Sequence, residues 1–178
     1  MASEAFETGP PSPEAIELGR VIDRGIRAAN LIDAGHLGID EEKVWEVFVD
    51  VYVLNYDGNL FDAGMLASTA ALASARMPTY DAEKDEVIRE GKLGKFKLGG
   101  MATSCTFAKI ADKIVLDATG NEEAYMASRI TITSDENDIV RAMQKGLRGA
   151  FSQKELDMLI ETSFQRSKDL RKLISNSQ

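Results

Sequence analysis

A run of β-branched and aromatic residues from Val44 to Tyr56 constrains the fold more than any other segment of the chain. Successive side chains of a strand point to opposite faces, so alternate positions of this run share a face. One face is wholly apolar and the other mixes apolar with acidic side chains: Trp45, Val47, Val49, Val51 and Val53, against Glu46, Phe48, Asp50, Tyr52 and Leu54. The run predicts one long strand, which ends at the turn signal Asp57-Gly58-Asn59.

The segment before this run predicts an amphipathic helix from Ser12 to about Asn30. Ser12 suits the N-cap position and Pro13 suits the first helical position. Apolar residues recur at helical spacing along one side: Ala15, Leu18, Ile22, Ile26 and Ala29. We expect that side of the helix to be buried against the rest of the protein.

Three arginines lie on roughly the opposite side of the same helix. Arg20, Arg24 and Arg27 are spaced i, i+4 and i+7, which places them in one stripe at 3.6 residues per turn. Arginine side chains bind phosphate through two parallel hydrogen bonds. The spacing also fits a solvated face with Glu17 and Asp23 as ion-pair partners, and it does not decide between the two.

The remainder of the chain predicts helices and antiparallel strands. Small residues dominate a helix expected over Asp62–Arg76, and a charged loop with short strands at most follows from Asp81 to Leu98. Strands are expected at 101–109, 113–117, 129–134 and 139–144, with a short helical turn at 121–127. The sequence Ser-Gln-Lys-Glu at 152–155 is a capping box that starts a terminal helix. The apolar stripe of that helix is expected to be Leu156, Leu159, Ile160, Phe164, Leu170 and Leu173.

The composition excludes several classes of protein. The chain has 178 residues and a formal net charge of −8, which argues against a general nucleic-acid coat, so any RNA contact must be local or shared with a partner. No apolar run is long enough to span a membrane, and the N-terminus has no signal-peptide core. With one histidine, His36, and one cysteine, Cys105, the chain has too few residues for a zinc site, for a Cys–His or Ser–His–Asp catalytic group, or for an internal disulfide. A reducing cytoplasm fits this cysteine usage, and Cys105 is expected to be a buried structural thiol.

Acidic residues gather after the strand expected at 113–117. Asp117, Glu122 and Glu123 could hold Mg²⁺ or supply a general acid, and they equally fit a solvated acidic loop. Neither Lys97-Leu98-Gly99-Gly100 nor Gly146-Leu147-Arg148-Gly149 matches a phosphate-binding glycine loop.

Four motifs in order resemble the RNase PH superfamily over nearly the whole chain. They are Phe6–Pro11, the Ile16–Arg27 helix, Asp50–Ala63, and Val115–Asp117 followed by Asn121–Glu123. Within that superfamily the chain is most similar to the non-catalytic RNase PH-like ring subunit of the archaeal RNA exosome. The resemblance implies an α+β fold of the RNase PH type. It also implies membership of a ring that degrades RNA from its 3′ end, with inorganic phosphate as the nucleophile.

The resemblance also implies that this chain is not itself an enzyme. Catalytic members carry a Gly-Ser/Thr-Arg turn that binds phosphate, where this chain has Gly58, Asn59 and Leu60, so the phosphate charge has no partner there. They also carry two aspartates six residues apart, of which Asp117 matches the first and Glu123 replaces the second. In the family's non-catalytic subunit two helix arginines face the RNA path, and these correspond to Arg20 and Arg24.

These correspondences give an expected function with two alternatives. The expected protein is a cytoplasmic, structural and RNA-guiding subunit that binds RNA, no membrane, and a catalytic RNase PH-like subunit in a heterohexameric ring. An active phosphorolytic exoribonuclease and an unrelated protein-binding α/β domain remain the alternatives.

The resemblance divides the chain into two subdomains. Family members begin with further residues that hold the first strands of the N-terminal sheet, and residues 1–5 look like the end of the last of those strands. The chain is therefore expected to be a fragment or a truncated form. We expect an incomplete N-terminal subdomain at 1–98 and a C-terminal subdomain at 99–178.

Overall fold

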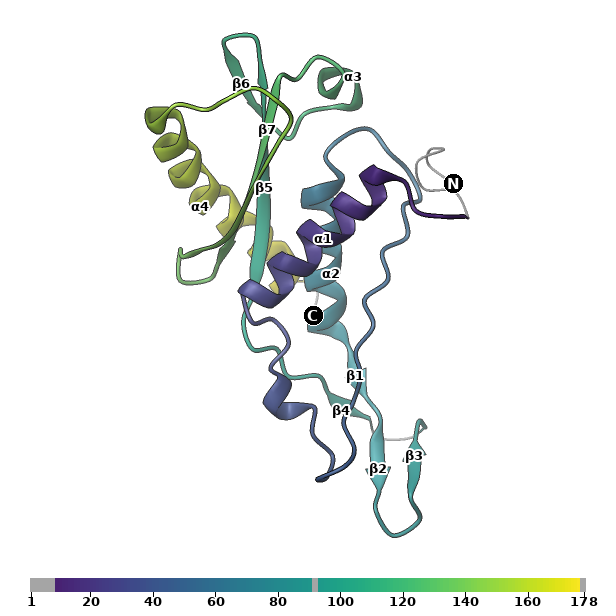
Figure 1. Cartoon of the computed structure of the whole chain (residues 1–178). Coiled ribbons are helices and arrows are strands. Elements are labelled where there is room, and N and C mark those ends of the chain that lie inside the picture. The colour runs from purple at the N-terminus through teal and green to yellow at the C-terminus, as the bar shows by residue number, and fades with distance from the viewer. Residues whose placement is uncertain (1–8, 91–92, 177–178) are drawn as a thin grey trace.

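A computed structural model of the chain describes residues 9–90 and 93–176 and confirms an α+β fold (Figure 1). The expected strand end at 1–5 and the first half of the Phe6–Pro11 motif lie outside the described residues. The elements, in chain order, are α1 (Pro13–Ala28), η2 (Ala34–His36), α2 (Leu60–Ser74), β1 (Arg76–Met77), β2 (Thr79–Asp81), β3 (Glu86–Ile88), β4 (Gly94–Lys95), β5 (Ala102–Ile110), β6 (Lys113–Leu116), α3 (Gly120–Glu123), β7 (Ser128–Asp135), β8 (Val140–Gly146) and α4 (Gln153–Asn176). Among the described residues, none of the helices combines the length and the hydrophobicity that a membrane span needs.

The centre of the molecule is an antiparallel sheet with strand order β6-β5-β7-β8. Helix α4 covers one face, and α1 and α2 cover the other (Figure 1). The face toward α4 is mainly apolar and packs Cys105, Phe107, Ile130 and Ile132 against Leu159. The face toward α1 and α2 carries paired hydroxyl groups, Ser104 with Thr133 and Thr106 with Thr131. Because the side chains of a strand alternate between its two faces, β5 and β7 together supply a mainly apolar face and a polar face.

Helix α1 confirms the amphipathic pattern. The Ser12 side chain accepts a hydrogen bond from the backbone N–H of Ala15, and Pro13 opens the helix. Its buried side packs against α2, where a Cβ at Gly64 would lie 2.5 Å from Cδ1 of Ile22. A glycine at this position therefore allows the two helices to approach closely.

Helix α4 confirms the capping box but not the whole predicted stripe. The Ser152 and Glu155 side chains cap each other's backbone N–H groups. The buried line of the helix is Leu159, Ser163, Ser167, Arg171 and Ile174. Leu173 was expected to be buried and is 60% exposed. Small serines let α4 lie close to β5, so the helix turns toward the sheet a face that hydrophobicity alone did not identify.

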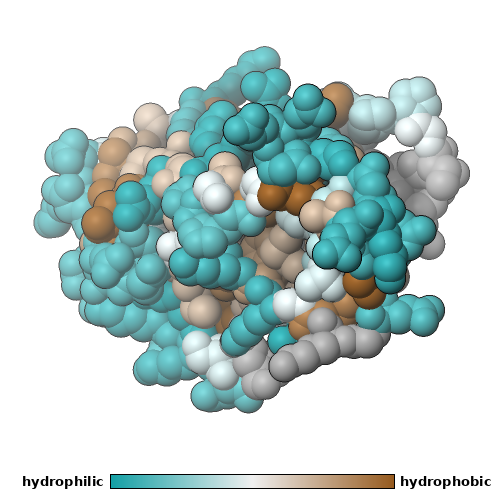
Figure 2. All heavy atoms as spheres, turned by 90° about the horizontal axis from the view of Figure 1, so that it is seen from below, coloured by the Kyte–Doolittle hydropathy of each residue, from teal (hydrophilic) through white to brown (hydrophobic). Residues whose placement is uncertain are grey.

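The predicted strand over Val44–Tyr56 is wrong. Only Val44 forms an isolated bridge, to Gly38, and the rest is extended chain that pairs with no other strand among the described residues. A β-strand is defined by hydrogen bonds to a neighbour, and the local pattern does not supply that neighbour. The predicted alternation of side chains is nevertheless present, and even-numbered positions face solvent: Phe48 is 75% exposed, Tyr52 83% and Leu54 89%. Figure 2 views the molecule from the lower end of Figure 1 and shows apolar surface in a hollow there.

Candidate nucleic-acid interface

The outer side of α1 carries two arginines whose charge no acidic group neutralises. Within the described residues, Arg20 has no hydrogen-bond or ion-pair partner. Arg24 has a neutral one, since its Nη1 donates to Oε1 of Gln144 on β8 at 2.5 Å. Both arginines line a groove of about 360 Å³ between α1 and β8, together with Pro13, Ile16, Glu17, Val21 and Gln144. This groove is a place where an anionic chain would meet two guanidinium groups.

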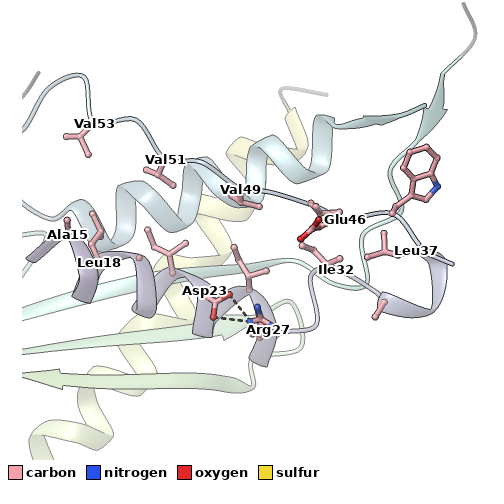
Figure 3. Close-up of a pocket in the computed structure, with 16 residues that line it drawn as sticks. Ala15, Leu18, Asp23, Arg27, Ile32, Leu37, Glu46, Val49, Val51 and Val53 are labelled. Carbon is pink, nitrogen blue, oxygen red and sulfur yellow. Dashed lines mark hydrogen bonds and ion pairs between the residues drawn. The ribbon is translucent and has the colours of Figure 1, made fainter. Parts of the chain in front are cut away.

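Arg27 belongs to the predicted stripe but differs from the other two arginines. Its Nε donates to both carboxylate oxygens of Asp23, at 2.8 and 3.0 Å. The pair lines a different groove, of about 610 Å³, between α1 and the extended segment 45–53 (Figure 3). Valines at alternate positions of that segment, Val49, Val51 and Val53 among them, line the opposite wall. The predicted pairing of Asp23 is confirmed, and the charge of Arg27 is already balanced.

Glu17, the other predicted helix partner, pairs instead with an arginine of the sheet. Its Oε1 lies 2.5 Å from Nη2 of Arg129, a buried side chain at the start of β7. The same guanidinium lies 4.1 Å from the ring centroid of Phe61 on α2. A Cβ at Gly146 would lie 2.7 Å from this Nη2. Arg129 thus ties α1, α2 and the sheet together beneath the exposed arginines.

Sequence reasoning missed Arg129 and Gln144. Both act across long sequence separations, 112 residues for the pair with Glu17 and 120 for the pair with Arg24. The one sequence signal for a buried ion pair was Arg129 itself, a charged residue directly before the alternating Ile-Thr run 130–133 of the strand.

The turn at Gly58 and Asn59 brings together three of the four predicted degenerate catalytic positions, Asn59, Asp117 and Glu123. Gly58 has φ +94°, and a Cβ there would lie 2.2 Å from the carbonyl oxygen of Ala118. The Asn59 amide donates to Oδ1 of Asp117 at 2.7 Å, and its backbone N–H donates to Oε1 of Glu123 at 2.9 Å. The fourth position, Leu60, is partly buried and packs against the hydrophobic core of α1 and α2.

A third carboxylate, Asp62, completes the cluster. The Asn59 amide donates to its Oδ2 at 2.8 Å, and Thr106 donates to it through both the backbone N–H and the hydroxyl, at 2.8 and 2.7 Å. Removal from water raises the pKa of Asp62, and these donors oppose that effect. The Tyr56 hydroxyl donates to Glu123, and this bond raises the pKa of Tyr56 to about 12.

The electrostatics of this cluster disfavour phosphate. In the described chain, no lysine or arginine hydrogen-bonds or pairs with Asp62, Asp117 or Glu123, although Arg166 lines the same cavity of about 430 Å³. A phosphate charge 4 Å from one of these carboxylates would be repelled by about 4 kcal/mol at an effective dielectric of about 20.

Glu122 was grouped with Asp117 and Glu123 in the sequence but serves a different purpose. It forms a capping box with Thr119 at the start of α3, and the hydrogen bonds from Thr119 lower the pKa of Glu122. No group of three or more histidine, cysteine or acidic side chains in residues 9–90 and 93–176 is arranged to hold a metal ion.

Cys105 is buried on the face of the sheet toward α4, as expected. Its sulfur lies 3.8 Å from the carbonyl oxygen of Ser163 and 3.7 Å from the Ser167 hydroxyl. Burial raises the pKa of Cys105 to about 11, so the group is a protonated thiol at neutral pH.

Comparison with known proteins gives consistent matches along the chain. Residues 1–78 match domain 1 of the 3′ exoribonuclease family, RNase PH, and residues 100–166 match domain 2. "Exosome complex component Rrp42" of Thermococcus gammatolerans is 42% identical over 177 residues, 98% of this chain and 65% of that protein. The protein of the same name from Pyrococcus furiosus is 42% identical over 180 residues, 99% of this chain and 65% of that protein.

The fold comparison agrees with the sequence comparison. A chain of the Archaeoglobus fulgidus exosome with RNA bound to the active site matches with a TM-score of 0.84 and 38% identity. The match covers 96% of this chain and 65% of that one. The chain therefore spans just under two thirds of the length of these relatives.

Proposed function

Because the chain belongs to the RNase PH family of 3′ exoribonucleases, we propose that it is a non-catalytic, RNA-guiding subunit of a phosphate-dependent 3′–5′ exoribonuclease ring. Its partners in this proposal are RNA and a catalytic RNase PH-like subunit, arranged in a heterohexameric exosome ring. The names of the relatives, which are exosome components, support this assembly.

One observation carries the RNA-guiding role: Arg20 and Arg24 present uncompensated positive charge on one groove of a chain whose net charge is −8. Solvent-exposed arginines of ordinary surfaces often pair with a neighbouring carboxylate, as Arg27 does with Asp23. A guanidinium that is not paired with a carboxylate can bind an RNA phosphate with two hydrogen bonds. The two arginines therefore hold the RNA strand as it passes toward the partner's active site.

The degenerate cluster supports the non-catalytic part of the proposal. Phosphorolysis needs a site that attracts inorganic phosphate, and Asn59, Asp117 and Glu123 offer three acidic or neutral side chains with Asp62 behind them. Leu60, in the place of the family's phosphate-binding arginine, is partly buried and packs against the hydrophobic core of α1 and α2. The site works as a structural junction between α2 and the β6–α3 turn.

Three further parts of the proposal rest on the resemblance and on simple chemistry. We place the protein in the cytoplasm, where a single unpaired cysteine fits a reducing compartment. We expect no cofactor and no metal. We also place the subdomain boundary between residues 98 and 99, a position that the two domain matches flank.

RNA binding by the assembled ring tests the role of the arginines. Fluorescence anisotropy with a labelled single-stranded RNA, measured at several salt concentrations, compares the parent ring with Arg20→Ala plus Arg24→Ala. Each lost phosphate contact lowers the slope of log K against log salt by about 0.7, so the double variant should lose about 1.4. The loss should be similar for all RNA sequences, because phosphate contacts do not read bases.

Arg27→Ala is the matched control, because Asp23 already balances its charge. Light scattering checks that each ring stays intact. If the double variant binds RNA as the parent does at equal salt, the two arginines are merely solvated and the proposed role is wrong.

A further inference from the structure

We propose that Gln144 is a positioning residue for RNA binding, which holds the Arg24 guanidinium in the orientation that receives a phosphate. This inference rests on the proposed function above, because it takes Arg24 as an RNA contact. It adds a residue from a different element, β8, 120 positions away along the chain.

The hydrogen bond between the two side chains fixes one edge of the guanidinium. Nη1 of Arg24 donates to Oε1 of Gln144, which leaves Nε and Nη2 without a partner in the described part of the chain. Those two nitrogens form the second fork of an arginine and match two phosphate oxygens. The bond therefore leaves the fork of Nε and Nη2 for a ligand.

Gln144 itself is held by the sheet. It lies opposite Thr131 in the β7–β8 ladder, and its side chain is half-buried beside α1. The arginine is exposed and belongs to the helix, so the sheet supplies the fixed end of the contact. An ordered donor fork loses less side-chain entropy when it binds a ligand than a freely rotating one.

The chemistry of the amide matters because it is neutral. A glutamine accepts from Arg24 without cancelling its charge, whereas a glutamate of the same length would form an ion pair and compete with phosphate. Arg27 shows that outcome within the same helix, where Asp23 occupies the guanidinium. The geometry thus distinguishes an arginine prepared for a ligand from one satisfied internally.

The test compares Gln144→Ala and Gln144→Glu in the assembled ring, with RNA affinity and its salt slope as the two readouts. Gln144→Ala frees Arg24 but keeps its charge, so we expect affinity to fall two- to tenfold with the slope unchanged. Gln144→Glu should weaken binding further and lower the slope by about 0.7, as Arg24→Ala does. A residue that only supports the fold would not produce this split.

A double-variant comparison separates the contact from a general charge effect. In an Arg24→Ala background, Gln144→Glu should have little further effect if it acts through Arg24. An equal effect of Gln144→Glu with and without Arg24 would overturn the inference, as would unchanged affinity in both Gln144 variants. If Arg24→Ala itself leaves RNA binding unchanged, it is the proposed role of Arg24 that fails. Thermal unfolding of each variant ring confirms that folding is preserved.

Discussion

Replacing Arg129 by methionine should destabilise the protein by about 2 kcal/mol. The buried Arg129 guanidinium joins three elements, through Glu17 on α1, the Phe61 ring on α2 and its own strand β7. A cation over an aromatic ring contributes about 1–2 kcal/mol when it is shielded from water. The pair with the partly exposed Glu17 adds up to about 1 kcal/mol.

Methionine keeps much of the aliphatic stem of Arg129, so this substitution reports mainly on the guanidinium. For a chain of this size, about 2 kcal/mol lowers the melting temperature by about 4–8 °C. Unfolding followed by far-UV circular dichroism, at several protein concentrations, measures both quantities.

The control is Arg148→Met, at an exposed arginine that has no partner among the described residues. A surface change of this kind should stay within about 0.5 kcal/mol. If Arg129→Met destabilises the protein no more than Arg148→Met does, then Arg129 does not tie the helices to the sheet.

Three further outcomes are expected. Gly58→Ala should cost more than about 3 kcal/mol in urea unfolding, because φ is +94° and the new Cβ would lie 2.2 Å from a backbone oxygen; a cost below about 1 kcal/mol would contradict the tight turn. Cys105, whose pKa is raised to about 11, should resist a thiol reagent at pH 8 until urea unfolds the chain; rapid labelling of the native chain would show that the thiol is accessible. The chain alone should self-associate and bind a hydrophobic dye through its exposed segment 44–56, and Phe48→Lys plus Tyr52→Lys should reduce both signals in light scattering and fluorescence.

Elements with local signals could be predicted from the sequence. The helix at Pro13–Ala28 has its N-cap and its periodicity within the segment, and the capping box at Ser152 and Glu155 specifies where the last helix begins. The strands from Ala102 onward carry β-branched runs separated by turn residues, and their observed bounds lie close to the expected ones. In these segments, the residues that favour a helix or strand and the residues that end it lie within the same short stretch of sequence.

Features that depend on distant parts of the chain could not be predicted in this way. The Val44–Tyr56 run has strand-like alternation, but a ladder requires a second strand that the run does not specify. The buried line of α4 includes Arg171, which reaches Ser134 and Asp138 and so is satisfied by contacts that its own helix does not reveal. The candidate site combines the two situations. The spacing of Arg20 and Arg24 can be read within one helix, whereas Gln144 contacts Arg24 from β8, a distant part of the chain.

Phosphate-dependent release of nucleoside diphosphates from RNA, measured as a function of RNA concentration, separates an RNA-guiding subunit from an enzyme. The chain alone should release none, and the ring with its catalytic partner should be active. Arg20→Ala plus Arg24→Ala should raise the RNA concentration needed for half-maximal rate and leave the maximal rate nearly unchanged. Asp117→Asn in this chain should leave catalysis by the ring intact. Release by the chain alone that Asp117→Asn abolishes would contradict the account, because the cluster around Asn59 would then be a working active site.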